Sequence, residues 1–94
     1  MSMTVLVVRN ASPKLCGFLA SSMLEMSAGV YVLVRMSASV RDLIWDVVES
    51  WKDPNTSAVM LWRDSQNPNL VSSKLVGTPR IELVEIDGMF VSKR

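Results

Sequence analysis

The sequence contains no histidine and a single cysteine, Cys16. Without histidine, the chain lacks the side chain that most often ligates metals and transfers protons near neutral pH. One cysteine permits neither an internal disulfide nor a cysteine-based zinc cluster. No apolar run approaches the ~20 residues that span a bilayer, and the N-terminus has no signal-peptide pattern. We therefore expect a cytoplasmic protein without membrane contact.

The chain also lacks an excess of charge, because its formal net charge is +1 over 94 residues. Such a protein does not bind polyanions through its overall charge, so contact with nucleic acid needs a local basic patch. Apolar residues make up 49% of the sequence, which is typical of a globular chain and not of a disordered one. In so small a domain, this composition favours burial of part of the apolar surface in a dimer.

The first third of the chain has the pattern of a strand, a helix and a strand. The unbroken run Val5–Val8 predicts a central strand covered on both faces. Ser12 and Pro13, followed by apolar residues at helical spacing, predict a helix over residues 13–26. Strand-forming residues then return over 28–34.

The clearest helical pattern covers residues 40–51. Ser39 and Asp42 approximate a capping box at its start, and Arg41 lies off the apolar stripe, which predicts an exposed side chain. The stripe, expected to face the core, consists of Val40, Leu43, Ile44, Val47, Val48 and Trp51.

Two hairpins complete the pattern. Residues 57–62 and 70–76 predict strands joined by turn residues, and residues 81–86 and 89–91 predict a second pair around Asp87-Gly88. The whole predicts an α+β, ferredoxin-like sandwich over residues 1–80, with two helices on one face of a mainly antiparallel sheet. Residues 81–94 are the C-terminal strand segment and tail of the same domain, available for partner or dimer pairing.

The order of particular residues carries a more specific resemblance. These residues are Asn10, Pro13, Lys14-Leu15, Gly17, Leu19, Leu24-Glu25, Ala28-Gly29-Val30-Tyr31-Val32, Ser37-Ala38, Arg41, Ile44-Trp45, Met60, Trp62 and Asp87-Gly88. Their order resembles the type I-E form of the second CRISPR-associated adaptation protein, most densely over residues 1–62. The resemblance implies a noncatalytic homodimer that holds a duplex DNA prespacer between dimers of the CRISPR-associated integrase. It also implies that the C-terminal segment pairs with the integrase by strand addition.

The resemblance implies DNA-phosphate contacts at Lys14, Arg41 and Arg80, which fix position without reading bases. Arg9, just before the helix of Lys14, is expected to face the same phosphate track near a helix N-terminus that favours anions. The competing interpretation is ordinary solvated charge, or for Arg41 a pair with neighbouring acids on the helix surface. Cys16 and Phe18 stand where basic or polar residues are expected. The stretch from Leu33 to Met36 is one residue longer than the turn that the resemblance implies, and Trp45, Trp51 and Trp62 are expected in the core or an interface.

Members of the wider family have also been described as metal-dependent nucleases with an acidic residue near the end of the first strand. Here that stretch is Val8-Arg9-Asn10, and a guanidinium repels Mg²⁺. We therefore predict no catalytic residue, no metal ligand and no cofactor. Two alternatives remain: a Mg²⁺-dependent endonuclease of the same family acting on RNA or DNA, and an unrelated ferredoxin-like ligand-binding or oligomerisation domain.

Overall fold

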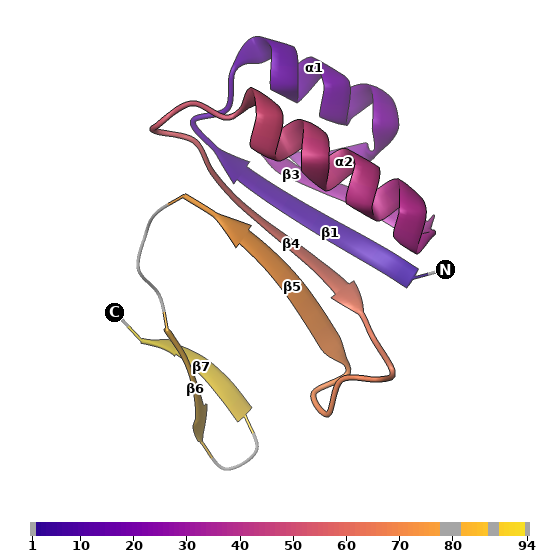
Figure 1. Cartoon of the computed structure of the whole chain (residues 1–94), viewed down its shortest axis with the longest axis vertical. Helices are drawn as coiled ribbons and strands as arrows, with labels where there is room; N and C mark the ends of the chain where they lie inside the picture. The colour runs from indigo at the N-terminus through magenta and orange to yellow at the C-terminus, as the bar shows by residue number, and fades with distance from the viewer. Residues whose placement is uncertain (1, 78–81, 87–88, 94) are drawn as a thin grey trace.

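The computed structural model describes residues 2–77, 82–86 and 89–93 (Figure 1). In chain order its elements are β1 (Ser2–Arg9), α1 (Pro13–Ser22), β2 (Leu24–Ser27), β3 (Val30–Met36), α2 (Ala38–Trp51), β4 (Ser57–Arg63), β5 (Val71–Val76), β6 (Glu82–Ile86) and β7 (Met89–Lys93). The predicted strands at 57–62 and 70–76 are confirmed as β4 and β5.

Five strands form one sheet in the order β2-β3-β1-β4-β5, and all neighbours in it are antiparallel. Both helices lie on the same side of this sheet (Figure 1). Together, β1 to β4 and the two helices have the chain order and strand order of a ferredoxin-like unit, to which β5 adds a fifth strand. The predicted α+β sandwich is confirmed. Strands β6 and β7 pair with each other, as predicted for the second hairpin.

The core lies between the sheet and the helices. Along β1 the side chains alternate: Leu6 and Val8 are buried under the helices, whereas Val5 and Val7 on the other face are only half-buried. The central position predicted for this strand is confirmed, but the prediction that both faces are covered is wrong for the described residues. The other buried apolar residues are Leu15, Leu19, Met23, Tyr31, Met36, Ile44, Trp45, Val48, Ala58 and Met60.

Helix α1 ends four residues earlier than predicted. The Ser12 side chain caps its start by accepting a hydrogen bond from the backbone N–H of Leu15, at 3.2 Å. After Ser22 the chain becomes extended, and Leu24–Ser27 pairs with β3 as an edge strand. The methionines that extend the helical spacing have different environments, because Met23 is buried and Met26 is 63% exposed. Backbone hydrogen bonds to β3 therefore decide the conformation of residues 24–27, although the spacing of apolar residues continues the helical pattern.

The turn between β2 and β3 requires a glycine. Gly29 has φ +78°, and a Cβ atom on it would lie 2.5 Å from the carbonyl oxygen of Val8. The carbonyl of Gly29 accepts a hydrogen bond from the backbone N–H of Val8 at 2.8 Å. This close approach holds the β2–β3 turn against β1.

Helix α2 starts earlier than predicted and is rotated relative to its apolar stripe. Its N-cap is Ser37, whose Oγ accepts from the Val40 backbone N–H at 3.3 Å, so the predicted cap at Ser39 is wrong. Val40 and Leu43 are 42% and 62% exposed, while Trp45, outside the predicted stripe, is 4% exposed. The large indole of Trp45 packs over the sheet. Helix α2 is therefore rotated so that its Trp45 side faces the core.

A β-bulge accommodates the additional residue expected between Leu33 and Met36. The register pairs Thr4 with Leu33 but Ser2 with Met36, so β3 has one more residue than β1 between these pairs. The bulge lies next to the start of α2. The extra residue therefore changes only the end of β3, and the pairing of β1 with β3 stays in register from Thr4 to Val7.

Candidate nucleic-acid and protein interfaces

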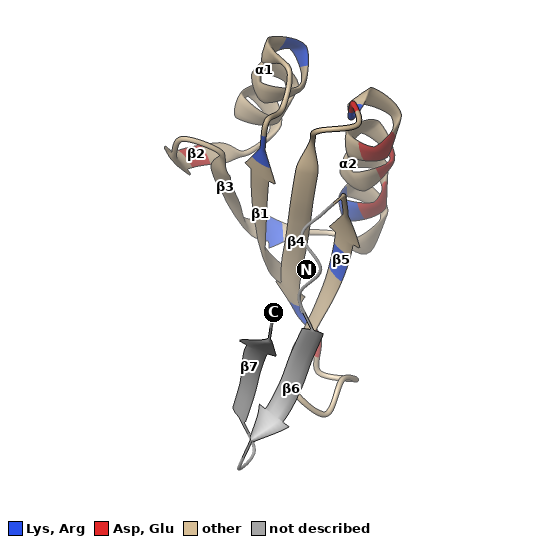
Figure 2. Ribbon diagram, turned by 90° about the vertical axis from the view of Figure 1, so that its left-hand side faces the viewer, with Lys and Arg blue, Asp and Glu red and all other residues tan. Residues whose placement is uncertain are grey.

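The predicted DNA-binding residues do not gather in one place. Arg9 ends β1 and Lys14 lies in the first turn of α1, so these two share one end of the sheet. Arg41 lies in the first half of α2, near the opposite end, and Arg80 lies outside the described residues. Basic residues accordingly occur at both ends of the sheet in Figure 2.

Lys14 is positioned by aromatic residues. Its Nζ atom lies 4.1 Å from the centroid of the Trp51 ring, and Phe18 meets the same ring edge-on at 5.5 Å between centroids. A cation–π contact of this kind at a solvent-exposed site is worth about 0.5–1 kcal/mol. The resemblance predicts a basic or polar residue at position 18. The phenylalanine found there packs instead against the Trp51 ring, and that ring orients Lys14.

Lys52 is a further basic residue at this end, and the sequence interpretation did not select it. It caps the C-terminus of α2 directly after Trp51, and its side chain is exposed. The end of α2 carries partial negative charge, which favours a lysine there. The proximity of Lys52 to Lys14 follows from the antiparallel arrangement of the two helices, and no local sequence pattern predicts it. Arg9, Lys14 and Lys52 are called the basic end below.

The loops at the basic end are tied together by hydrogen bonds. Asn10 has φ +57°, and its Nδ2 donates to the carbonyl of Asn55 at 3.3 Å. The buried Thr56 hydroxyl donates to the carbonyl of Asn10 at 2.9 Å and lies 3.1 Å from Oδ1 of Asp53. This network fixes the start of α1 relative to the end of α2.

The same region does not suit a divalent cation. The donor set at the end of β1 consists of the Arg9 guanidinium, which repels cations, and one neutral amide of Asn10. Mg²⁺ prefers carboxylate oxygens, of which this stretch has none. In the described part of the chain, no three His, Cys, Asp or Glu side chains come together in a way that would hold a metal ion.

Arg41 differs most from its expected environment. The prediction that it is exposed is wrong: the side chain is half-buried, with its Cζ atom 4.0 Å from the centroid of the Trp62 ring. The rotation of α2 causes this burial. The alternative pairing with Asp42 is also not formed, because Asp42 accepts from Lys74 of β5 at 3.3 Å.

Two further polar groups have perturbed pKa values. Hydrogen bonds from the Ser72 hydroxyl and the Gln66 backbone N–H lower the pKa of Asp64, and the charge of Arg41 adds to this effect. Burial raises the pKa of the Tyr31 phenol far above its usual range, and the nearby Cys16 and Glu25 contribute. Cys16 is half-buried with its Sγ 3.9 Å from the carbonyl oxygen of Ala11, as expected of a packing residue.

The face of the sheet opposite the helices, called the open face below, is mostly apolar. Cross-strand pairing aligns Val5 with Val32 and Leu61, and Val7 with Val30 and Val59. Exposure rises toward its periphery, reaching 52% at Met3 and 68% at both Val34 and Leu75. A contiguous apolar surface of this kind marks an interaction site in a soluble protein.

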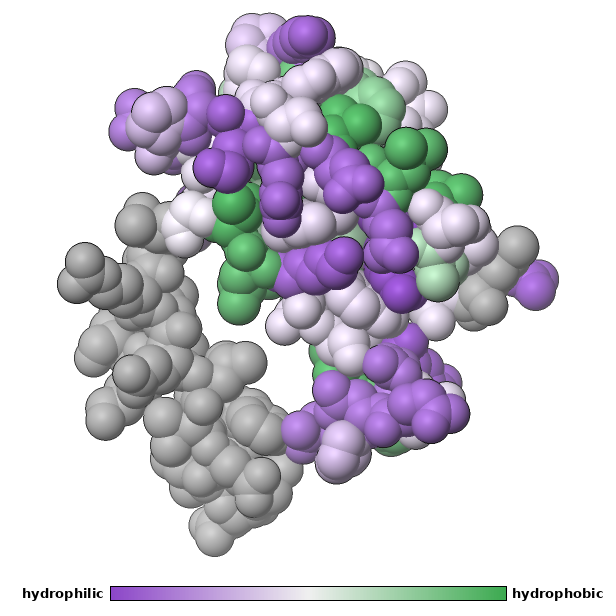
Figure 3. Space-filling model, viewed as in Figure 1, coloured by the Kyte–Doolittle hydropathy of each residue, from purple (hydrophilic) through white to green (hydrophobic). Residues whose placement is uncertain are grey.

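The helical layer exposes a smaller apolar area. Hydrophobic side chains (green) gather over this layer on the upper right of Figure 3. The exposed large hydrophobic residues of α2 are Val40 and Leu43. Helix rotation thus moves two predicted core residues to the surface.

The two helices and the antiparallel sheet define a small ferredoxin-like α+β protein with an apolar open face and a basic end. The family model of the CRISPR-associated protein family Cas_Cas2CT1978 matches residues 3–91. The chain belongs to this family of CRISPR-associated proteins. None of the helices that the structure describes has the length and hydropathy to span a membrane.

Proposed function

We propose that this chain is the noncatalytic homodimeric scaffold of a type I-E CRISPR adaptation complex, holding prespacer duplex DNA between integrase dimers during spacer acquisition. Membership of the CRISPR-associated family over residues 3–91 carries the proposal. The order of motif residues over 1–62 supports the finer assignment to the adaptation subunit of type I-E.

The open face supports the homodimer. The solvated face of an antiparallel sheet usually carries polar side chains, yet here it carries Val5 and Val7 of β1, which remain half-buried in the single chain. A two-fold pairing of open faces would cover these valines in both copies. The hairpin of β6 and β7 supplies the C-terminal strands that we assign to pairing with the integrase.

The basic end supports the DNA contact. Arg9, Lys14 and Lys52 are exposed, and α1 presents its positive dipole end beside them. The one acid of the adjoining loop, Asp53, already accepts a hydrogen bond from the backbone N–H of Asn55. Three cations of one subunit thus lie at one end of the sheet, which the low net charge of the whole chain does not reveal.

Spacer acquisition tests the function directly. The CRISPR-associated integrase is expressed together with this chain and co-purified, and new spacers in the CRISPR array are counted in cells that express both. We expect a stable complex, and acquisition that falls at least tenfold in an Arg9→Gln/Lys14→Gln double variant. Arg35→Gln, which removes an exposed arginine of β3 instead, is the matched control and should acquire spacers normally. Absence of a complex, or acquisition that does not need this chain, would refute the scaffold role.

A nuclease assay decides between the scaffold and the catalytic alternative. Highly purified protein is incubated with RNA and with duplex DNA, with and without Mg²⁺. The scaffold proposal requires that neither substrate is cut. Mg²⁺-dependent cleavage that Asn10→Ala abolishes would establish the endonuclease, and a bound small molecule without any affinity for nucleic acid would favour the unrelated ligand-binding domain.

A further inference from the structure

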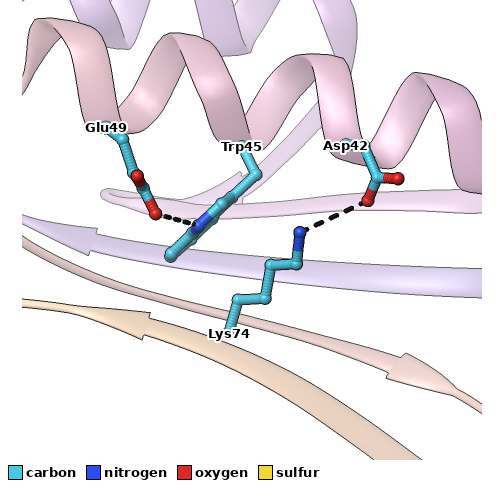
Figure 4. Close-up of polar contacts among 4 residues, drawn as sticks. All are labelled: Asp42, Trp45, Glu49 and Lys74. Atoms are coloured by element: carbon cyan, nitrogen blue, oxygen red, sulfur yellow. Dashed lines mark hydrogen bonds and ion pairs between the residues drawn. The ribbon is translucent and has the colours of Figure 1, made fainter.

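The flank of α2 that faces β5 carries several charged groups, and its carboxylates already have donors (Figure 4). Lys74 of β5 reaches Asp42 with 3.3 Å between Nζ and Oδ1. One turn further along α2, the indole Nε1 of Trp45 donates to Oε1 of Glu49 at 2.6 Å. Neither carboxylate forms a hydrogen bond or an ion pair with Arg41.

Asp64, at the end of β4, is also occupied. Its Oδ2 accepts from the Ser72 hydroxyl at 2.7 Å, and its Oδ1 accepts from the Gln66 backbone N–H at 2.9 Å. The positive charge of Arg41 acts on Asp64 only from a distance, because the two side chains do not form an ion pair. Asp42, Glu49 and Asp64 thus each accept from another donor, and none of them pairs with Arg41.

Arg41 itself is held in place and lacks a side-chain partner among the described residues. Its guanidinium lies over Trp62, and its Nε atom is buried without a hydrogen-bond partner. Stacking on the indole fixes the plane of the guanidinium, so its N–H groups form a preformed planar fork. An unpaired buried donor is costly to the fold, so this Nε–H marks Arg41 as a side chain whose hydrogen-bonding capacity the chain itself does not use.

The surroundings of this fork favour a single carboxylate over the phosphates of a duplex. A duplex presents several phosphates, whereas one carboxylate brings a single negative charge close to Asp42, which is next to Arg41 in sequence, and to Asp64, on which the charge of Arg41 acts. Arg41 also lies away from the basic end: the β1–β4 register places Trp62 about 17 Å along the strand from Ser57, the partner of Arg9, at ~3.3 Å per residue. A planar fork matches one carboxylate in bidentate geometry.

We propose that Arg41, stacked on Trp62, is a recognition site for a carboxylate of a protein partner, supplied by an acidic side chain or a chain end. In this proposal Arg41 binds a protein carboxylate and is not one of the DNA contacts that the sequence predicts. The site is a small, partly desolvated clamp at the α2–β5 side of the domain, separate from the open face and from the basic end.

A titration followed by NMR tests the chemical preference of the site. Full-length ¹⁵N-labelled protein is titrated with N-acetylglutamate amide, whose free carboxylate is on the side chain, and separately with dimethyl phosphate, at matched ionic strength. We expect the glutamate derivative to shift the Arg41 Nε–H and Trp62 indole signals saturably, with at least fivefold tighter binding than dimethyl phosphate. In Arg41→Lys, which keeps the charge but not the fork, the shift of the Trp62 signal should be lost.

Equal or tighter binding of dimethyl phosphate would overturn the proposal, as would the absence of a saturable response to the carboxylate. Arg41→Lys that keeps the full Trp62 response would overturn it as well. This titration does not depend on the proposed adaptation role, so it decides the inference even if no CRISPR complex forms.

Duplex binding by the complex with the integrase provides the second arm, which rests on the proposed function. The slope of log K against log salt falls by about 0.9 for each phosphate contact removed. We expect this fall for Arg9→Gln and no change for Arg41→Gln. A fall for Arg41→Gln would assign Arg41 to DNA and overturn the proposal, whereas a complex that binds no duplex at all would refute the scaffold role alone.

Discussion

The two faces of β1 contain similar residues in different environments. Thr4, Leu6 and Val8 point under the helices and are buried, whereas Val5 and Val7 point to the open face and remain half-buried. Among the described residues, a helical layer covers one face only. The comparison shows that the apolar residues of β1 on one face build the core, whereas those on the other face are the ones that the proposed dimer would cover.

The largest effect is expected on the covered face. Leu6 is fully buried at the centre of the core, so Leu6→Ala should lower the free energy of unfolding by about 2–5 kcal/mol through lost contacts and a cavity. Chemical denaturation measured at several protein concentrations checks this. A loss below about 1 kcal/mol would mean that the covered face is not the principal core.

The open face should respond differently. Val5→Lys places a charge at the centre of the proposed dimer interface, once in each copy, and should weaken self-association on the order of 100-fold. Unfolding of the monomer should change by only about 1 kcal/mol, because the lysine tip can reach solvent. Analytical ultracentrifugation measures the first quantity, and denaturation at low concentration the second. If the wild-type protein stays monomeric at high concentration, the open face is not a dimer interface and this comparison of the two faces fails.

Much of the fold is predictable from local patterns, and the exceptions have physical causes. The strands β1, β4 and β5 and the existence of α2 follow from unbroken or periodic apolar segments. Strand β2 escapes prediction because Met23 and Met26 continue the helical spacing of α1, and only pairing with β3 reveals the strand. The cap of α2 is ambiguous in the sequence because Ser37 and Ser39 both precede the apolar stripe, and side-chain geometry selects Ser37.

The candidate site is less predictable than the fold. Lys14 follows from the family resemblance and Arg9 from its place before the helix start, and the two do share one end of the sheet. The ring under Lys14, however, comes from Trp51, which is distant in sequence. The burial of Arg41 depends on how α2 rotates about its axis. Packing against Trp45 and Trp62 decides that rotation, and the periodicity of the helix alone does not.

A third, smaller effect tests the outer surface of the helical layer. Gly17 lies inside α1 without a positive φ, and a Cβ atom added to it would meet no other atom within 4 Å. Gly17→Ala should therefore stabilise the fold by about 0.5–1 kcal/mol. Gly29→Ala is the matched control with the opposite sign, because its φ and its contact with Val8 exclude a side chain. Thermal unfolding compares them, and weaker binding of DNA or integrase by Gly17→Ala would show that this surface is also an interface.

The smallest effect concerns pH and the end of the β4–β5 hairpin. The pKa of Asp64 is lowered in the folded chain, so its stabilising contribution is present above the ordinary pKa of 3.8 and is lost as pH falls through the folded value. Asp64→Asn should remove this part of the acid dependence and change stability little at pH 7, because the carboxyl is at the surface. Unfolding midpoints between pH 2 and about 6 measure it. An unchanged acid dependence in Asp64→Asn would contradict the assignment.

Strand β2 has a consequence for how sheets of this protein meet. It is only four residues long, every side chain in it is exposed, and its pairing with β3 shifts register between Glu25 and Ser27. A short, irregular edge that carries a carboxylate is a poor template for another strand. Growth of the sheet from this side is therefore disfavoured, so joining copies edge to edge through β2 is a poor route to open-ended fibrils.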